Sequence, residues 1–256
     1  MISIFGIIYV RIDTVMLSLF KGDAVVGWYN AAYNLVLGFS FIPQLFMNCL
    51  LPSLSFYSVS SKEALQVTYE KSFKYLFILG LPISVGIFML SDKVILLFYG
   101  NNFINSIVAL QILTWDIVLM FLCNCVAFAL ISINKQNQMA TAAAGSAVLN
   151  IVLNLFLIPN YSYIGSGIAT IATEIFLLVI YVYLITQYTL TLNIKKIVLP
   201  SSLASLIMGV FLYVSTELPF VLQLFIAVII YFIFLIILKG FTKDDVRIFK
   251  QVFKKS

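Results

Sequence analysis

Stretches of hydrophobic residues about 20 long, separated by short polar breaks, follow one another along the whole chain. A helix of that length rises about 30 Å, which matches the hydrocarbon core of a bilayer. The segments are too long and too continuously apolar for the alternating strands of a membrane barrel. The pattern therefore predicts eight membrane-spanning helices, near residues 1–20, 31–52, 74–91, 105–132, 139–158, 164–188, 197–216 and 220–238.

The polar breaks carry turn residues, as at "KGD" (21–23), "YGNN" (99–102), "NKQNQ" (134–138), "PNYS" (159–162) and "ELP" (217–219). Two longer polar segments predict helices that lie on the membrane surface. In the first, within residues 53–73, Ser60 and Glu63 have the spacing of a capping box. The second is the tail from Thr242 to Ser256, where apolar residues share one face beside basic ones.

The composition agrees with a membrane protein and argues against a soluble enzyme. Hydrophobic residues make up 62% of the chain and charged residues 10%, and the mean hydropathy is +1.10. The chain has three cysteines and no histidine, and the cysteines have no metal-ligand spacing, which indicates free thiols, no metal site and no cofactor. Neither a nucleophile elbow, a zinc-protease motif nor a phosphate-binding loop occurs, so we expect no enzyme activity.

Lysine and arginine are distributed unequally between the two sides of the predicted helices. Twelve lie on the side that includes the 53–73 segment, the 133–138 loop and the C-terminal tail, and two, Lys21 and Lys93, lie on the other. Because basic loops stay in the cytoplasm, the twelve mark the cytoplasmic side, and the N-terminus shares it. The net charge of +5 is thus explained by orientation in the cell membrane, and does not indicate binding to nucleic acid.

Two charges fall inside the first predicted span. Arg11 lies about 15 Å from either end of that helix, so its side chain cannot easily reach water. It shares a helical face with Thr14 and Ser18, whereas Asp13 points to the other side. Each charge either faces a polar cavity or binds a neighbouring helix and locks the packing. The polar face favours the cavity for Arg11, and the two readings stay open for Asp13.

Further polar groups recur at helical spacing inside later spans. Ser146, Asn150 and Asn154 form one face of the fifth span, and Gly167, Thr170, Glu174 and Tyr181 form one face of the sixth. Asp116 lies deep in the fourth span. The asparagines are most simply explained as amides that join helices, but the carboxyl groups favour a cavity for a polar substrate.

Several segments resemble one family in order along the chain. "RIDTVMLSLFKGDAVVGWYNAAYNLVLGFSFIPQLFMNCLLPSLS" resembles the seventh and eighth helices of polysaccharide-unit flippases of the MATE-like exporter superfamily, with the pattern R-x-D-x-x-M-L, G-x-Y-x-A-A-Y, P and L-P-x-L-S. "LLFYGNNF", "INKQ" and "LNIVLNLFLIPNYSYIGSGIATIATE" are similar to the second half of the same family. The resemblance covers nearly the whole chain.

The resemblance implies an all-helical membrane fold: the second six-helix lobe of a flippase over residues 1–188, and two additional helices with a cytoplasmic tail over 189–256. It implies an isoprenoid diphosphate-linked oligosaccharide as the substrate for export. Arg11 and Asp13 occupy the family's R-x-D positions, and guanidinium binds phosphate oxygens at two points. We expect substrate binding by Arg11, Asp13, Thr14, Asn150 and Asn154, and cation coupling or cavity lining by Asp116 and Glu174.

Family members normally have twelve or fourteen spans, so we expect a missing N-terminal lobe supplied by a separate chain, or a homodimer in its place. Two alternatives remain open: a cation-coupled drug antiporter of the same fold, and a non-transporting membrane scaffold or degenerate fragment that binds a glycan-assembly partner.

Overall fold

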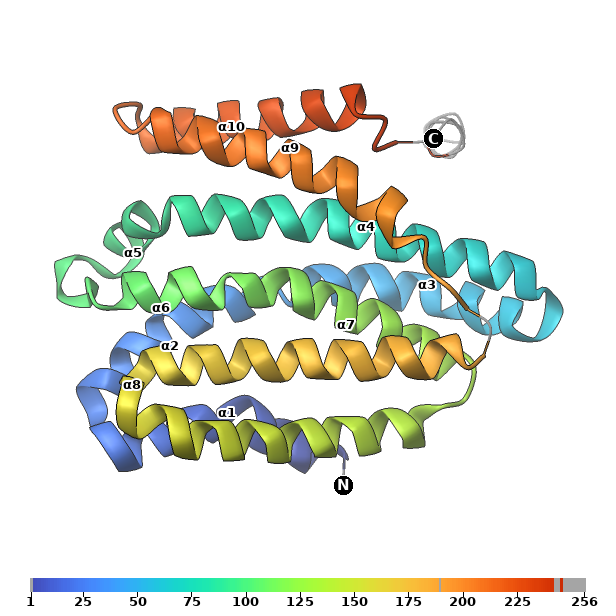
Figure 1. Cartoon of the computed structure of the whole chain (residues 1–256), viewed down its shortest axis with the longest axis horizontal. Coiled ribbons are helices and arrows are strands. Elements are labelled where there is room, and N and C mark those ends of the chain that lie inside the picture. The colour runs from blue at the N-terminus through green and yellow to red at the C-terminus, as the bar shows by residue number, and fades with distance from the viewer. Residues whose placement is uncertain (1, 189, 242–244, 246–256) are drawn as a thin grey trace. The chain divides into compact units, whose positions relative to one another are not determined.

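The computed structural model describes residues 2–188, 190–241 and 245, and the side chains of these from residue 12 onward. In this part of the chain the regular structure is entirely helical (Figure 1). The chain divides into two compact units, Met1–Leu192 and Asn193–Ser256. The first unit contains α1 (Ile2–Lys21), α2 (Asp23–Leu37), α3 (Phe41–Ser60), α4 (Lys62–Met89), α5 (Ser91–Tyr99), the 3₁₀ turn η1 (Asn101–Phe103), α6 (Ser106–Leu113), α7 (Trp115–Ser132) and α8 (Gln136–Thr186); the second contains α9 (Ile194–Val214) and α10 (Phe220–Ile237).

The predicted membrane-spanning bundle is confirmed. Six helical segments among the described residues are long and apolar enough to cross a bilayer, one of them formed by α2 with α3 and one by α6 with α7. The segment Gln136–Thr186 is 51 residues long, and it folds back on itself at Ser162 (Figure 1). With its two arms counted separately and α1 added, the helices correspond to the eight predicted spans.

The reversal of α8 lies at the predicted "PNYS" turn. Ser162 has φ 55° and ψ −137°, well outside helical values, and Pro159 precedes it. Lys21, at the end of α1, donates a 2.9 Å hydrogen bond to the backbone carbonyl of Pro159. This bond satisfies a carbonyl at the end of the first arm, where the helix can no longer supply a partner. The ends of α1 and of the first α8 arm are thereby tied together.

Gly165 allows the two arms of α8 to approach each other closely. A Cβ atom at this position would lie 2.4 Å from the backbone carbonyl oxygen of Leu157. We therefore expect Gly165→Ala to lower the free energy of unfolding by about 1–3 kcal/mol, the usual cost of overpacking. Thermal unfolding in detergent would measure it. Gly145→Ala is the matched control, because no atom lies within 4 Å of a Cβ there; equal effects of the two substitutions would contradict the explanation.

The centre of the first unit is α7, which packs against α3, α4 and α8. Its inward residues include Ile117, Phe121 and Cys125, none of which is exposed. In a bilayer, apolar burial does not favour helix association, so close packing and polar contacts hold such helices together. The polar groups between the helices are consequently the features that specify this arrangement.

The prediction of a separate surface helix within residues 53–73 is wrong, because this segment is divided between the end of α3 and the start of α4. Helix α3 runs to Ser60 and α4 begins at Lys62, with Ser61 alone between them in an extended conformation. The cap is formed by Ser61, whose side chain accepts a hydrogen bond from the Ala64 amide, and not by Ser60. The polar residues of this segment therefore continue the membrane-spanning helices α3 and α4. The predicted tail helix lies outside the described residues.

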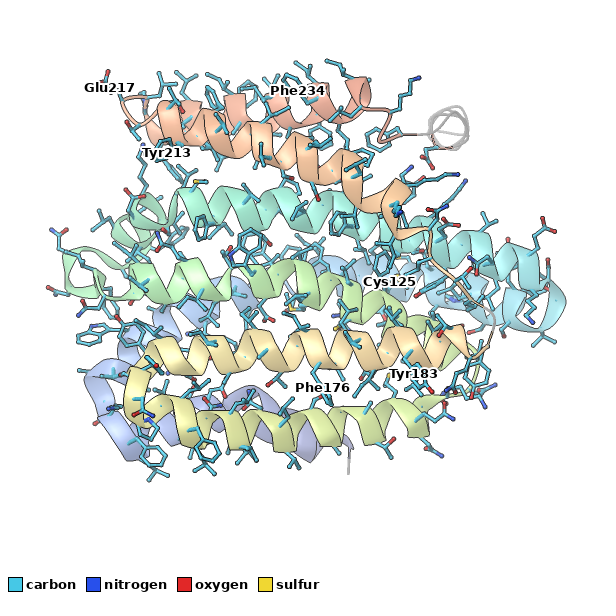
Figure 2. The ribbon with its side chains drawn as sticks, viewed as in Figure 1. Cys125, Phe176, Tyr183, Tyr213, Glu217 and Phe234 are labelled. Carbon is cyan, nitrogen blue, oxygen red and sulfur yellow. The ribbon has the colours of Figure 1, made fainter. Side chains whose placement is uncertain are left out.

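The second unit is a helical hairpin held by buried polar contacts. Gln223 of α10 donates hydrogen bonds to the backbone carbonyl of Leu212 and to Ser215, both at the end of the preceding helix segment. Nearer the other end of α10, the hydroxyls of Ser201 and Tyr231 lie 3.3 Å apart. Figure 2 shows Tyr213 and Glu217 at the end of the hairpin that carries the turn, with Phe234 on α10.

The predicted orientation can be tested by chemical labelling. In a background without the three native cysteines, we expect Asn102→Cys to react with a membrane-impermeant maleimide in intact cells. Ser61→Cys and Asn137→Cys should react only after permeabilisation, because the basic residues mark their side as cytoplasmic. All three side chains are exposed, so a difference in labelling between them reports the side of the membrane and not burial in the protein. The reverse labelling would overturn the orientation.

Candidate functional site

Asp13 is the centre of a buried polar cluster formed by α1, α2 and both arms of α8. Its side chain is 5% exposed. One carboxylate oxygen, Oδ2, accepts hydrogen bonds from the Tyr29 hydroxyl at 3.0 Å and the Thr170 hydroxyl at 2.7 Å. The other, Oδ1, accepts one from the Asn154 amide at 2.6 Å. Three donors from different helix segments therefore converge on one carboxylate inside the span.

The hydrogen atoms of this cluster can be assigned consistently. The Asn154 amide has two, and the second is donated to Asn150 Oδ1 at 2.9 Å. The hydroxyls of Tyr29 and Thr170 lie 3.1 Å apart, but each has a single hydrogen, and both hydrogens can point to Asp13. The Asp13 carboxyl group is thus held by three hydrogen bonds from three helix segments. Asn154 Oδ1 is buried and has no hydrogen-bond partner.

The cluster brings together three of the sequence-predicted substrate residues: Asp13, Asn150 and Asn154. Thr14 lies beside it without joining it, and its hydroxyl donates instead to Asn30 Oδ1 on α2 at 3.0 Å. Arg11 lies within helix α1, but the structure does not describe its side chain. The position proposed for it therefore remains a prediction from the helical spacing.

The two predicted coupling residues lie on neighbouring helices. Asp116 is in the first turn of α7 and is 7% exposed, and Glu174 is half-buried on the second arm of α8. The thiol of Cys123 on α7 lies 3.9 Å from the backbone carbonyl of Glu174, which places these helices in contact. Asp116 interacts electrostatically with Glu174 and with Asp13.

Sequence analysis missed Tyr29 as a site residue and placed Thr170 only on a polar face. Tyr29 is fully buried, stacks on Tyr33, and donates to Asp13. Its signal in the sequence was weak, because a tyrosine in a span is more often a membrane-interface anchor. The predicted polar face of the sixth span agrees with the structure at Thr170, whose hydroxyl donates to Asp13.

Chemically, the cluster holds one carboxyl group away from water. Asp13, Asn150 and Asn154 offer carboxylate and amide oxygens, which are ligands of hard cations. Among the described residues, no group of three or more histidine, cysteine, aspartate or glutamate side chains could hold a metal ion. Cys49 is exposed, whereas Cys123 and Cys125 are buried, and all three are free thiols, as their positions predicted.

The sequence is similar to known membrane proteins. Residues 1–108 match the pattern of a family described as polysaccharide biosynthesis proteins. A relative from Haloferax volcanii, named "Probable low-salt glycan biosynthesis flippase Agl15", is 25% identical over 169 residues, which cover 66% of this chain and 36% of the relative. An uncharacterized membrane protein of Methanocaldococcus jannaschii is 25% identical over 163 residues, 62% of this chain and 32% of that protein.

The fold is similar to solved transporter structures. The lipid II flippase MurJ in an inward closed conformation has a TM-score of 0.75 at 21% identity, over 91% of this chain and 51% of MurJ. A MOP superfamily transporter from Pyrococcus furiosus has a TM-score of 0.62 at 17% identity, over 83% of this chain and 51% of the transporter. This chain thus spans about half of each of these structures, and its sequence matches about a third of each relative.

The family match over residues 1–108 and the similarity to a probable glycan biosynthesis flippase point in the same direction as the resemblance found in the sequence. The chain is a multi-pass membrane protein, and its fold is that of the two solved transporters.

Proposed function

We propose that this chain, a relative of the polysaccharide flippases, forms one lobe of a transporter that moves an isoprenoid diphosphate-linked oligosaccharide from the cytoplasmic to the outer face of the cell membrane. The observation that carries the proposal is the Asp13 cluster. It fixes α1 against α2 and both arms of α8 by hydrogen bonds, and α1 is the helix that carries Arg11.

A fixed α1 gives Arg11 a defined position at the depth of the bilayer midplane. Asp13 and Arg11 are two residues apart on a helix, so their side chains leave it on different sides. From this spacing alone we expect Arg11 to lie on the other side of α1 from Asp13, toward a second lobe or the space between lobes. A guanidinium there can bind the diphosphate at two points while the isoprenoid chain stays in lipid.

We include a second lobe in the proposal. The support is that the chain matches about half of each solved transporter structure, and a cavity between two lobes needs walls from both. The second lobe comes from another polypeptide segment or from a second copy of this chain. Symmetry about an axis along the membrane normal would leave the termini of both lobes on the same side.

Binding in lipid nanodiscs tests the substrate class. Full-length chain, with and without a co-expressed first lobe, is titrated with a labelled isoprenoid diphosphate disaccharide, with the matching isoprenoid alcohol, and with a hydrophobic cation. We expect the diphosphate lipid to bind at least tenfold more tightly than the alcohol, about 1.4 kcal/mol or more. Binding of the cation without any preference for the diphosphate would overturn the proposal in favour of a drug antiporter.

A further inference from the structure

Three exposed carboxamide side chains lie along the membrane span that α2 and α3 form together. Asn34, Gln44 and Asn48 are all exposed, and we call them the carboxamide row. Asn34 and Asn48 are two heptads apart, a spacing that stays on one side of a helix, and Gln44 lies one turn before Asn48. The residues between α2 and α3 do not break this side, because Gly38 and Ser40 have helical φ and ψ. The row extends about 21 Å along the span.

The other side of α3 packs against the rest of the first unit. Pro43, Met47 and Leu54 are buried there, and the helices that α3 meets are α4 and α7. In the most apolar stretch of the α2–α3 span 17% of the residues are buried, against 61% in the α6–α7 span. The carboxamide row therefore lies on a side of α2–α3 that this unit leaves open.

The carboxamide row needs polar partners, because it lies at the depth of the hydrocarbon core. A carboxamide group has two hydrogens to donate and an oxygen that accepts, and leaving these groups without partners in an apolar medium is costly. Pro52, inside α3 and exposed, has no amide hydrogen, so the backbone carbonyl of Asn48 lacks its usual helical donor. Such groups inside a membrane span face protein or a water-filled cavity.

The residues beside the carboxamide row indicate what kind of partner fits it. The sequence from Ala24 to Ser61 contains no charged residue, so the surface is not built to bind an ion. Phe41 and Phe56 are 59% and 67% exposed, and side chains of this size keep a neighbouring helix at a distance, whereas polar membrane helices pack closely through small residues. Neutral amides beside apolar rings suit a neutral ligand with many hydroxyl groups, since each hydroxyl both donates and accepts.

We infer that the carboxamide row binds the saccharide part of the transported lipid and selects among glycans. The inference rests on the proposed function, in which Arg11 binds the diphosphate. The two sites divide the ligand by its chemistry, because a guanidinium attracts the charged group and the uncharged amides hydrogen-bond the sugar hydroxyls. Polar groups that bind a hydroxyl discriminate strongly against a ligand that lacks it.

Binding in nanodiscs by the full-length chain with a co-expressed first lobe tests the inference. The two probes are an isoprenoid diphosphate disaccharide and the same isoprenoid diphosphate without sugar. We expect the wild type to bind the disaccharide lipid about tenfold more tightly or better. The double variant Asn34→Leu with Asn48→Leu should lose most of this preference, while its affinity for the sugar-free lipid stays within about twofold. Asn102→Leu, at an exposed position outside the spans, is the matched control and should keep the preference.

A labelling experiment tests the same surface independently of affinity. In the background without native cysteines, Asn48→Cys should react with a water-soluble maleimide, and the disaccharide lipid should slow this reaction more than the sugar-free lipid does. Absence of reaction at Asn48→Cys would show that the row faces lipid or another helix, and would overturn the inference.

The outcomes separate this inference from the proposed function. If the wild type binds both lipids equally, or the double variant keeps the preference for the disaccharide, the inference is wrong and the diphosphate site stands. If the wild type binds neither lipid, both are wrong. A smaller assembly mass of the double variant in light scattering would assign the carboxamide row to packing between helices instead of to the sugar.

Discussion

Asp13→Ala should lower the free energy of unfolding by about 2–4 kcal/mol, the largest effect on stability that we expect from a single polar substitution in the first unit. The substitution removes three hydrogen bonds to a buried carboxyl group. The loss is limited because Tyr29 and Thr170 can still bond to each other, and Asn154 to Asn150. Asp13→Asn keeps an acceptor oxygen and should cost about half as much. Thermal unfolding in detergent measures both.

Asp92→Ala is the control for Asp13→Ala, because Asp92 is exposed and should change the unfolding free energy by less than about 1 kcal/mol. A double-mutant cycle sharpens the comparison. Asp13→Ala and Thr170→Val should be non-additive, since both remove the same 2.7 Å hydrogen bond. If Asp13→Ala costs no more than Asp92→Ala, the cluster does not join the helices.

Arg11→Ala should reduce glycan export by at least a hundredfold in an assembled transporter, while the amount of protein in the membrane stays near normal. The reason is the loss of the planar, two-point contact with the diphosphate, and Arg11→Lys should restore only part of the export because an ammonium group cannot make that contact. Export of the surface polysaccharide in a strain that lacks its own flippase measures the effect. Immunoblots of membranes measure abundance.

Two outcomes would change the role of Arg11. If abundance falls together with export, Arg11 binds a neighbouring helix and locks the packing. Normal export by Arg11→Ala would remove the residue from the mechanism. Lys21→Ala, which breaks only the bond to the Pro159 carbonyl, is a matched control for the loss of a positive charge from the same helix.

Much of the fold follows from the sequence because a bilayer imposes a length on every apolar helix. The turns at "KGD", "YGNN" and "PNYS" coincide with Gly22, Gly100 and Ser162, each of which has a positive φ. Helix ends beyond the membrane were harder to place. The polar residues at the end of α3 and the start of α4 have the pattern of a surface segment. They include no glycine or proline that would stop a helix, so α3 continues to Ser60 and α4 begins at Lys62.

The sequence predicted Asp13, Asn150 and Asn154 as site residues but not Tyr29, and it predicted the contacts between them only in part. Helical spacing showed that Asn150 and Asn154 share a face, and that Asp13 points away from the polar face of Arg11. Which helix meets that side of α1 depends on packing between distant segments, and no local pattern encodes it. In the structure the Asp13 carboxyl group bonds to Tyr29, Asn154 and Thr170, and these bonds favour a packing role for it in this conformation.

Translocation in proteoliposomes tests the central claim most directly. Full-length chain is reconstituted alone and together with a first flippase lobe, and the movement of a fluorescent isoprenoid diphosphate oligosaccharide between leaflets is followed by quenching from outside. Size-exclusion chromatography with light scattering gives the mass of each preparation. We predict movement by the two-lobe assembly or by a homodimer, loss of that movement in Arg11→Ala, and none by a monomer of this chain. Translocation by the monomer, or two-lobe preparations that leave the lipid in place while remaining folded, would contradict the account.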